Sequence, residues 1–107
     1  MEFQVSEMLS EGLYSGRNCG DEIPVGFLFG KLAKYQFIGA PISLQRLELG
    51  EILNINLKIL GVEFCGREIE CVPKGHTALI RLEGNGNKVL LTELSRLKQH
   101  EYISLMG

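Results

Sequence analysis

The chain has 107 residues, enough for one domain but too few for two hydrophobic cores of ordinary size. Hydrophobic residues make up 45% of it and charged residues 22%, so the chain can bury enough apolar surface to fold rather than stay disordered. Its formal net charge of −2 gives no general attraction to phosphate backbones. This charge argues against a sequence-blind nucleic-acid binder and leaves only local basic contacts open.

The sequence predicts neither a secretion signal nor a membrane span. Residues 1–7 carry acids where a secretion signal needs basic residues followed by an apolar core. The longest uncharged run, residues 35–45, contains Gly39 and Pro41 and is far shorter than the roughly 20 apolar residues that span a bilayer. We therefore expect a soluble, cytoplasmic protein without membrane contact.

The N-terminal segment is predicted to form a short helix followed by a loop. Its apolar residues recur at helical spacing at Val5, Met8, Leu9 and Leu13. Residues 12–24 are rich in Gly, Ser, Asn and Asp, a composition typical of a loop. We therefore expect the β-structure to begin after this loop.

The segment from Phe27 to Phe37 is predicted to form a long strand. Its odd-numbered positions are apolar except for Lys31, so this side can be buried. Apolar residues at even positions blur the alternation, as expected of a strand that is covered on both faces or coils round a barrel. Gly30 can provide the bulge that such a bend requires.

Two short elements are predicted next. Ile42 and Leu44 suggest a strand, and Pro41 suits the entrance of that strand. Gly50 is predicted to form a turn between the apolar pairs of residues 47–53. The glycines that follow are mostly about 8–12 residues apart, which is typical of short strands joined by turns.

The clearest strand lies at residues 55–59, where aliphatic and polar side chains alternate. Residues 62–64 and 68–72 are predicted to pair as a hairpin with Gly66 in its turn, the glutamates of the return strand facing water. Pro73-Lys74-Gly75 ends that strand, and residues 78–82 form another.

The C-terminal part begins with a predicted turn at residues 84–87, where glycine and asparagine tolerate a positive φ. The leucines that follow recur at helical spacing at Leu90, Leu94 and Leu97. A second arrangement, a strand over 88–91 and a helix from Thr92 to about His100, fits the same stretch. Residues 102–105 can then close the sheet.

Several of these segments together resemble a known family. Residues 47–53, Leu-Glu-Leu-Gly-Glu-Ile-Leu, are similar to a glycine turn in the second domain of translation GTPases such as elongation factor Tu. Residues 57–60 match the strand before that domain's variable hairpin, residues 68–72 its return strand, and residues 73–84 its later glycine-bounded strand. The resemblance covers about residues 47–84. It implies a mainly β fold, a small closed antiparallel β-barrel, and we place the barrel core at about residues 25–91. The short helices expected at the two ends come from the apolar spacing and are not part of the family's basic pattern.

The resemblance also implies a function. In the family this barrel contacts the acceptor end of tRNA or the ribosome, so the chain would be a stand-alone, non-enzymatic binding module that contacts RNA or the translation machinery through its loops. A GTPase domain is excluded because no Gly-x-x-x-x-Gly-Lys-Ser/Thr motif occurs in the sequence. The first half of the chain has no counterpart to the glycine-containing strand that opens the family's domain.

The predicted binding residues are Arg67, Lys74 and His76, in or next to the two turns of the hairpin region. A basic loop of this kind can contact phosphate or an acidic partner. The simpler interpretation is that these are scattered surface charges, the default for any soluble domain.

Two other hypotheses stay open. The chain can be a small acidic inhibitor, immunity or adaptor protein that presents its glutamates to a basic protein partner. These glutamates are Glu48, Glu51, Glu63, Glu68 and Glu70. It can also be an enzyme or ligand-binding protein with a pocket in the barrel mouth, although no acid, base, nucleophile and orienting group form a recognisable set. We therefore expect no catalytic residue and no cofactor; the oligomeric state and the partner stay open.

The cysteines and histidines are the candidate ligands for a metal ion. The three cysteines are an odd number without a dense disulfide framework, so reduced thiols are expected. Cys65, Cys71 and His76 can approach one ion across the hairpin, with Cys19 or His100 as the fourth ligand, but the close Cys-x-x-Cys pair of zinc sites is absent. We expect no metal, with Cys65 in a turn and Cys71 in the core. Nothing in the sequence fixes either histidine beside a thiol or hydroxyl nucleophile.

Overall fold

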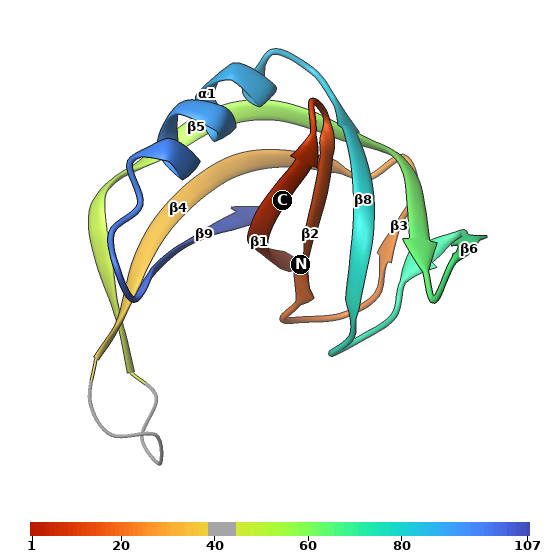
Figure 1. Cartoon of the computed structure of the whole chain (residues 1–107), viewed down its shortest axis with the longest axis horizontal. Helices are drawn as coiled ribbons and strands as arrows, with labels where there is room; N and C mark the ends of the chain where they lie inside the picture. Colours follow the sequence, from red (N-terminus) through yellow and green to blue (C-terminus); the bar gives the residue numbers. More distant parts are fainter. Residues whose placement is uncertain (39–44) are drawn as a thin grey trace.

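The computed structural model describes residues 1–38 and 45–107, and within them the chain is mainly β (Figure 1). The short strand predicted at Ile42 and Leu44, with Pro41 at its entrance, lies outside the described residues. The described elements, in chain order, are β1 (Glu2–Ser10), β2 (Leu13–Asn18), β3 (Ile23–Pro24), β4 (Leu28–Ile38), β5 (Gln45–Phe64), β6 (Arg67–Ile69), β7 (Cys71–Val72), β8 (Thr77–Glu83), α1 (Gly86–Ser95) and β9 (Glu101–Met106).

The strands pair antiparallel in two sheets. In the described part of the chain a 7-stranded sheet has the order β4-β9-β1-β2-β8-β5-β6, and β3 pairs with β7 in a separate sheet. Because β4 also pairs with β5, hydrogen-bonded neighbours lead from β4 through β9, β1, β2, β8 and β5 back to β4 (Figure 1). The mainly β, antiparallel fold class is therefore confirmed.

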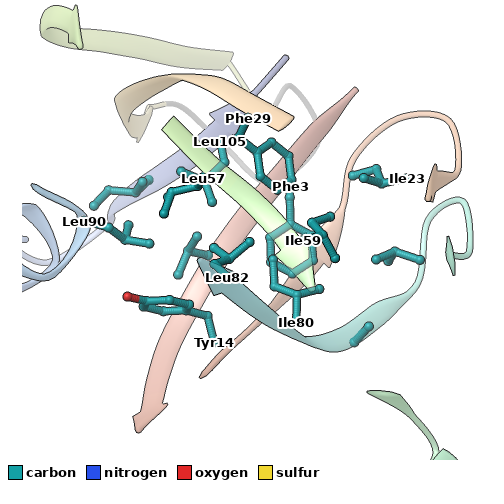
Figure 2. Packing of buried hydrophobic residues seen from close by; sticks show 14 of the residues in the cluster. Phe3, Tyr14, Ile23, Phe29, Leu57, Ile59, Ile80, Leu82, Leu90 and Leu105 are labelled. Atoms are coloured by element: carbon teal, nitrogen blue, oxygen red, sulfur yellow. The ribbon is translucent and has the colours of Figure 1, made fainter. Parts of the chain in front are cut away.

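The core lies between these strands, as Figure 2 shows. Its fully buried side chains come from both ends of the chain as well as from the middle: Phe3, Tyr14, Phe29, Leu57, Ile59, Ile80, Leu90 and Leu105. Leu57 and Ile59 are both 0% exposed, which confirms the alternating strand predicted at residues 55–59. Each such aliphatic side chain stabilises the fold by about 1.5–3 kcal/mol through the apolar surface it buries.

The N-terminal helix prediction was wrong, because the segment forms β1, paired with β2. The register between the two strands shifts between Val5 and Glu7 and again between Met8 and Ser10. Each shift inserts an extra residue and moves the following side chain to the other face of the strand. Apolar residues in a regular strand recur at every second position. The two extra residues in β1 interrupt this period, and the remaining apolar residues then have spacings that resemble those of a helix.

The loop predicted at residues 12–24 was also wrong in large part, since this stretch contains β2 and β3. Its small residues serve packing rather than flexibility. A Cβ atom at Gly16 would collide with the ring of Phe3 and the carbonyl of Gln4, so this strand position requires glycine.

The long strand predicted from Phe27 is confirmed as β4, and its pairing with β5 is irregular at Gly30. The register shifts between Phe29 and Lys31, where two residues of β5 lie opposite one of β4, so the extra residue is in β5 rather than in β4. Phe29 and Leu32 both belong to the main core, while Tyr35 packs in a second cluster. Buried residues therefore occur at both odd and even positions of β4.

Gly50 does not form the predicted turn, because it lies inside β5, a strand of 20 residues. Its φ is 66°, and the partner of β4 jumps from Leu49, opposite Lys34, to Leu53, opposite Leu32. Residues 50–52 are therefore a bulge. A glycine with positive φ suits a bulge as well as a turn, and the sequence does not distinguish the two.

The hairpin predicted around Gly66 is confirmed. Cys65 and Gly66 connect Phe64 with Arg67, and their φ values of 52° and 78° fit the type I′ turn favoured in two-residue hairpin loops. The return strand is shorter than predicted. It ends after the three residues of β6, and the two residues of β7 pair with β3 instead.

The C-terminal part combines a helix and a strand. The helix α1 runs from Gly86 to Ser95, with Asn85 as its N-cap residue. The strand predicted over 88–91 is therefore wrong, and the helix ends earlier than either arrangement expected. Its Leu90 is buried in the core. Residues 101–106 form β9 between β4 and β1, which confirms that the last residues complete the sheet.

Candidate binding site

The predicted binding residues lie at one end of the molecule, which we call the loop end: residues 17–21, the hairpin tip 64–67, and the turn 73–76. In that turn the amide of His76 donates to the carbonyl oxygen of Pro73 at 3.2 Å, and Gly75 has a φ of 74°. A positive φ at the third position is typical of a type II turn. Lys74 therefore projects from a tight, defined loop.

Asn18 ties two parts of the loop end together. Its side chain is 0% exposed, and its amide nitrogen donates to the carbonyl oxygens of Asp21, Val72 and Pro73 at 2.8, 3.1 and 3.3 Å. Its amide oxygen accepts from the backbone N–H of Gly20 at 2.9 Å. A buried polar group satisfied in this way fixes the backbone around it.

A hollow of about 250 Å³ lies between the two segments that Asn18 joins, and we call it the cationic hollow. It is lined by Arg17, Asn18, Cys19, Gly20, Lys74 and Gly75. The Nζ of Lys74 lies 3.8 Å from a carboxylate oxygen of Asp21, but the two side chains are 75% and 86% exposed. Such an exposed pair contributes only about 0–1 kcal/mol, so Asp21 holds Lys74 weakly.

A second hollow, the apolar hollow, has a volume of about 240 Å³. It is lined by Ser15, Phe64, Cys65, Thr77, Ala78 and Leu79. The ring of His76 packs edge-on against Phe64, with 5.4 Å between the ring centroids. Arg67 is the cross-strand partner of Phe64, so both side chains belong to the same face of the hairpin.

The register of β2 with β8 places the two hollows next to each other. Arg17, which lines the cationic hollow, pairs with Thr77, which lines the apolar hollow. The predicted residues are thus divided: Lys74 lines the cationic hollow, whereas Arg67 and His76 lie beside Phe64 at the apolar hollow. Sequence reasoning missed Arg17, Asn18 and Phe64, because only strand register gives them a place in the site.

The cysteines are free thiols, with Cys65 in the hairpin turn as predicted and Cys71 only half-buried in β7. Partial desolvation, aided by the charge of Glu2, raises the pKa of the exposed Cys19 thiol and keeps it protonated at neutral pH. Cys19 is therefore a poor nucleophile. Among residues 1–38 and 45–107, no three or more His, Cys, Asp or Glu side chains come together to hold a metal ion.

A different cluster lies on β1, β4, β5 and β9, and we call it the aromatic clasp. The rings of Tyr35 and Tyr102 are 5.6 Å apart, and the guanidinium of Arg46 lies 4.1 Å above the Tyr35 ring. Arg46 also donates to the carboxylate of Glu2 at 2.7 Å, and the hydroxyl of Ser104 donates to the same oxygen at 2.7 Å. The polar groups of this cluster thus satisfy one another.

The pKa of Glu2 reflects these contacts. Burial alone would raise it, but the hydrogen bonds from Arg46 and Ser104 and the charge of Arg46 outweigh burial, and the pKa is lowered. Glu2 therefore stays ionised and neutralises Arg46.

The glutamates predicted for a basic partner are distributed along the chain. Glu63 and Glu68 face each other across the β5–β6 hairpin, and both are exposed. Glu48 lies opposite Tyr35, on the part of β5 that pairs with β4. Like charges directly opposite each other destabilise a strand pair, so the hairpin contains an unfavourable contact.

Comparison of the chain with models of protein families, with curated proteins and with solved structures finds no match. In the described part of the chain, no helix has both the length and the apolar character needed to cross a bilayer.

Proposed function

We propose that this chain is a non-enzymatic binding module that contacts single-stranded RNA, as part of the translation machinery, through its loop end. The circuit of strand pairings from β4 back to β4 supports a small closed barrel of the kind found in the second domain of translation GTPases. The order of a long strand, a hairpin, a glycine turn and another strand in β5, β6 and β8 fits the same comparison.

The observation that carries the proposal is the cationic hollow. Arg17 and Lys74 come from segments far apart in the sequence and line one hollow whose frame is fixed by the buried Asn18. A frame that is ordered before binding loses little conformational entropy when a ligand arrives. Phosphate oxygens are strong acceptors for two such cations.

The net charge of −2 limits the kind of binding. Because the molecule as a whole does not attract polyanions, affinity has to come from a few defined contacts at the loop end. For a single strand, the logarithm of the binding constant then falls with the logarithm of salt concentration by about 0.7 per phosphate contacted.

The test is fluorescence anisotropy with a labelled single-stranded RNA. Lys74→Ala and Arg67→Ala should each weaken binding about three- to tenfold, while stability changes by less than about 0.5 kcal/mol. Lys98→Ala, which removes an exposed lysine outside the loop end, is the matched control and should bind as the wild type does. The proposal is contradicted if all three variants bind the RNA equally tightly, or if the wild type shows no measurable binding.

A second candidate function is supported by the facing pair Glu63 and Glu68. A basic protein partner would remove the repulsion between these carboxylates, as expected for an acidic inhibitor or adaptor. Glu68→Gln should then stabilise the free hairpin by about 0.2–1 kcal/mol and weaken capture of that partner. Co-purification from the source cells separates the two functions: RNase removes the partners under the first, whereas one stoichiometric basic protein resists RNase under the second.

A further inference from the structure

The loop end has a cationic hollow and an apolar hollow side by side. Each nucleotide of RNA has one group suited to each of them. The cationic hollow has a volume of about 250 Å³ and the apolar hollow about 240 Å³. The paired residues Arg17 and Thr77 place one beside the other. A nucleotide likewise joins an anionic phosphate to a flat base with two π faces.

The apolar hollow has the features of a base-stacking site. Phe64 provides an aromatic ring, and its edge-on contact with His76, at an interplanar angle of 76°, supports the ring from the side. Ala78 and Leu79 add apolar surface, and the hydroxyls of Ser15 and Thr77 are polar groups on the lining that can meet the edge of a base. Stacking of a base on an aromatic side chain tolerates any base identity.

The cationic hollow has the features of a phosphate site. Arg17 and Lys74 supply charge, and Gly20 and Gly75 have no side chain to keep an anion away from the backbone. Asp21 competes for Lys74, but the 3.8 Å separation and the high exposure of both groups make this competition weak.

We propose that the two hollows together form a subsite for one nucleotide of single-stranded RNA, with the base stacked on Phe64 and a phosphate held between Arg17 and Lys74. This subsite deepens the proposed function and rests on it. A phosphorylated peptide, the main alternative ligand for the cations, would occupy the cationic hollow alone.

The experiment compares two labelled oligomers of equal length, a uridine RNA and the same ribose–phosphate chain without bases. The RNA should bind about tenfold more tightly, the range expected for one stacked base. Phe64→Ala should remove that difference and leave the affinity for the abasic chain unchanged. Lys74→Ala should weaken both oligomers, and Asp21→Asn should tighten both about twofold, because it removes the competing carboxylate.

Two variants control for folding and position. Thr77→Leu changes an exposed residue that lines the apolar hollow, so it should block the base without disturbing the core. Phe37→Ala removes an aromatic side chain that is 39% exposed and lies opposite Arg46, at the other end of β5 from Phe64, and should leave RNA affinity unchanged.

The outcomes separate the subsite from the function. Equal affinity for the RNA and the abasic chain in the wild type would overturn the nucleotide subsite while leaving RNA-backbone binding in place. Preference for a phosphopeptide over both oligomers would overturn the subsite and the RNA function together, as would the absence of any binding. If both Phe64→Ala and Thr77→Leu bind the RNA no more tightly than the abasic chain, the result supports the subsite.

Discussion

Two ion pairs, one in the aromatic clasp and one at the loop end, use similar residues for opposite purposes. Arg46 and Glu2 are 2.7 Å apart, and the Glu2 side chain is only 18% exposed. Lys74 and Asp21 are 3.8 Å apart and almost fully in solvent. The first pair is locked into a network with Ser104 and the tyrosine rings, whereas the second leaves its lysine available. The surroundings of a cation, rather than its presence, therefore separate a structural residue from a binding one.

The largest effect is expected at Asn18, on which the shape of the loop end depends. Asn18→Ala should lower the free energy of unfolding by about 3 kcal/mol, because the buried carbonyl group of Val72 and the partly buried one of Pro73 lose their donor. Urea denaturation measures this change. Asn85→Ala is the matched control, since Asn85 is exposed and its side chain makes no capping hydrogen bond. A loss below about 0.5 kcal/mol at Asn18 would contradict the role given to it.

Arg46→Ala should lower the free energy of unfolding by about 2 kcal/mol, because it leaves the partly buried Glu2 without its cation and uncovers Tyr35. Lys74→Ala should change it by less than about 0.5 kcal/mol. The effects on RNA affinity should be reversed, so that Lys74→Ala weakens RNA binding more than Arg46→Ala does. If both variants were equally stable, or if Arg46→Ala weakened RNA binding more, the contrast between the two regions would be lost.

The ion pair of Glu2 should also make stability depend on pH. Because the folded state lowers the pKa of Glu2 from 4.5, the pair stabilises the fold fully above about pH 4.5 and loses this contribution as the pH falls through the lowered value. Glu2→Gln removes this dependence. We expect the free energies of unfolding of the wild type and Glu2→Gln to differ by about 1 kcal/mol at pH 7 and to become equal as the pH falls to 3. Thermal unfolding over this pH range measures the difference. A difference that is constant with pH would argue against the pairing.

The smallest effect is expected in the salt dependence of RNA binding. Each lost phosphate contact lowers the slope of log affinity against log salt by about 0.7. Lys74→Ala should show this reduction, and Arg46→Ala should not, since Glu2 already neutralises Arg46. Anisotropy titrations over a series of salt concentrations measure the slope for both variants. The same slope for Lys74→Ala and the wild type would remove Lys74 from the phosphate site.

The elements predicted correctly are those specified by neighbouring residues. The alternation at residues 55–59, the Cys65-Gly66 turn and the Gly75 turn each follow from a few adjacent side chains. The N-terminal hairpin was missed because two register shifts in β1 hide its alternation. Gly50 was assigned to a turn because a bulge requires the same positive φ.

The candidate site shows the same limit. Lys74 and His76 were predicted because they lie in or beside a turn, which is visible in the sequence. Arg17 and Phe64 take part only because their strands β2 and β5 each pair with β8, which is distant in sequence. Such long-range register is decided by the packing of the whole core, so no local pattern reveals it.

A titration of ¹⁵N-labelled protein with single-stranded RNA, followed by NMR, tests directly whether the loop end is the binding surface. Amide signals should shift at residues 15–20, 64–67 and 74–79, and those of Tyr35, Arg46 and Tyr102 should stay in place. Shifts centred on the aromatic clasp, or no shifts at RNA concentrations that saturate other single-strand binders, would contradict the assignment of the loop end as the binding surface.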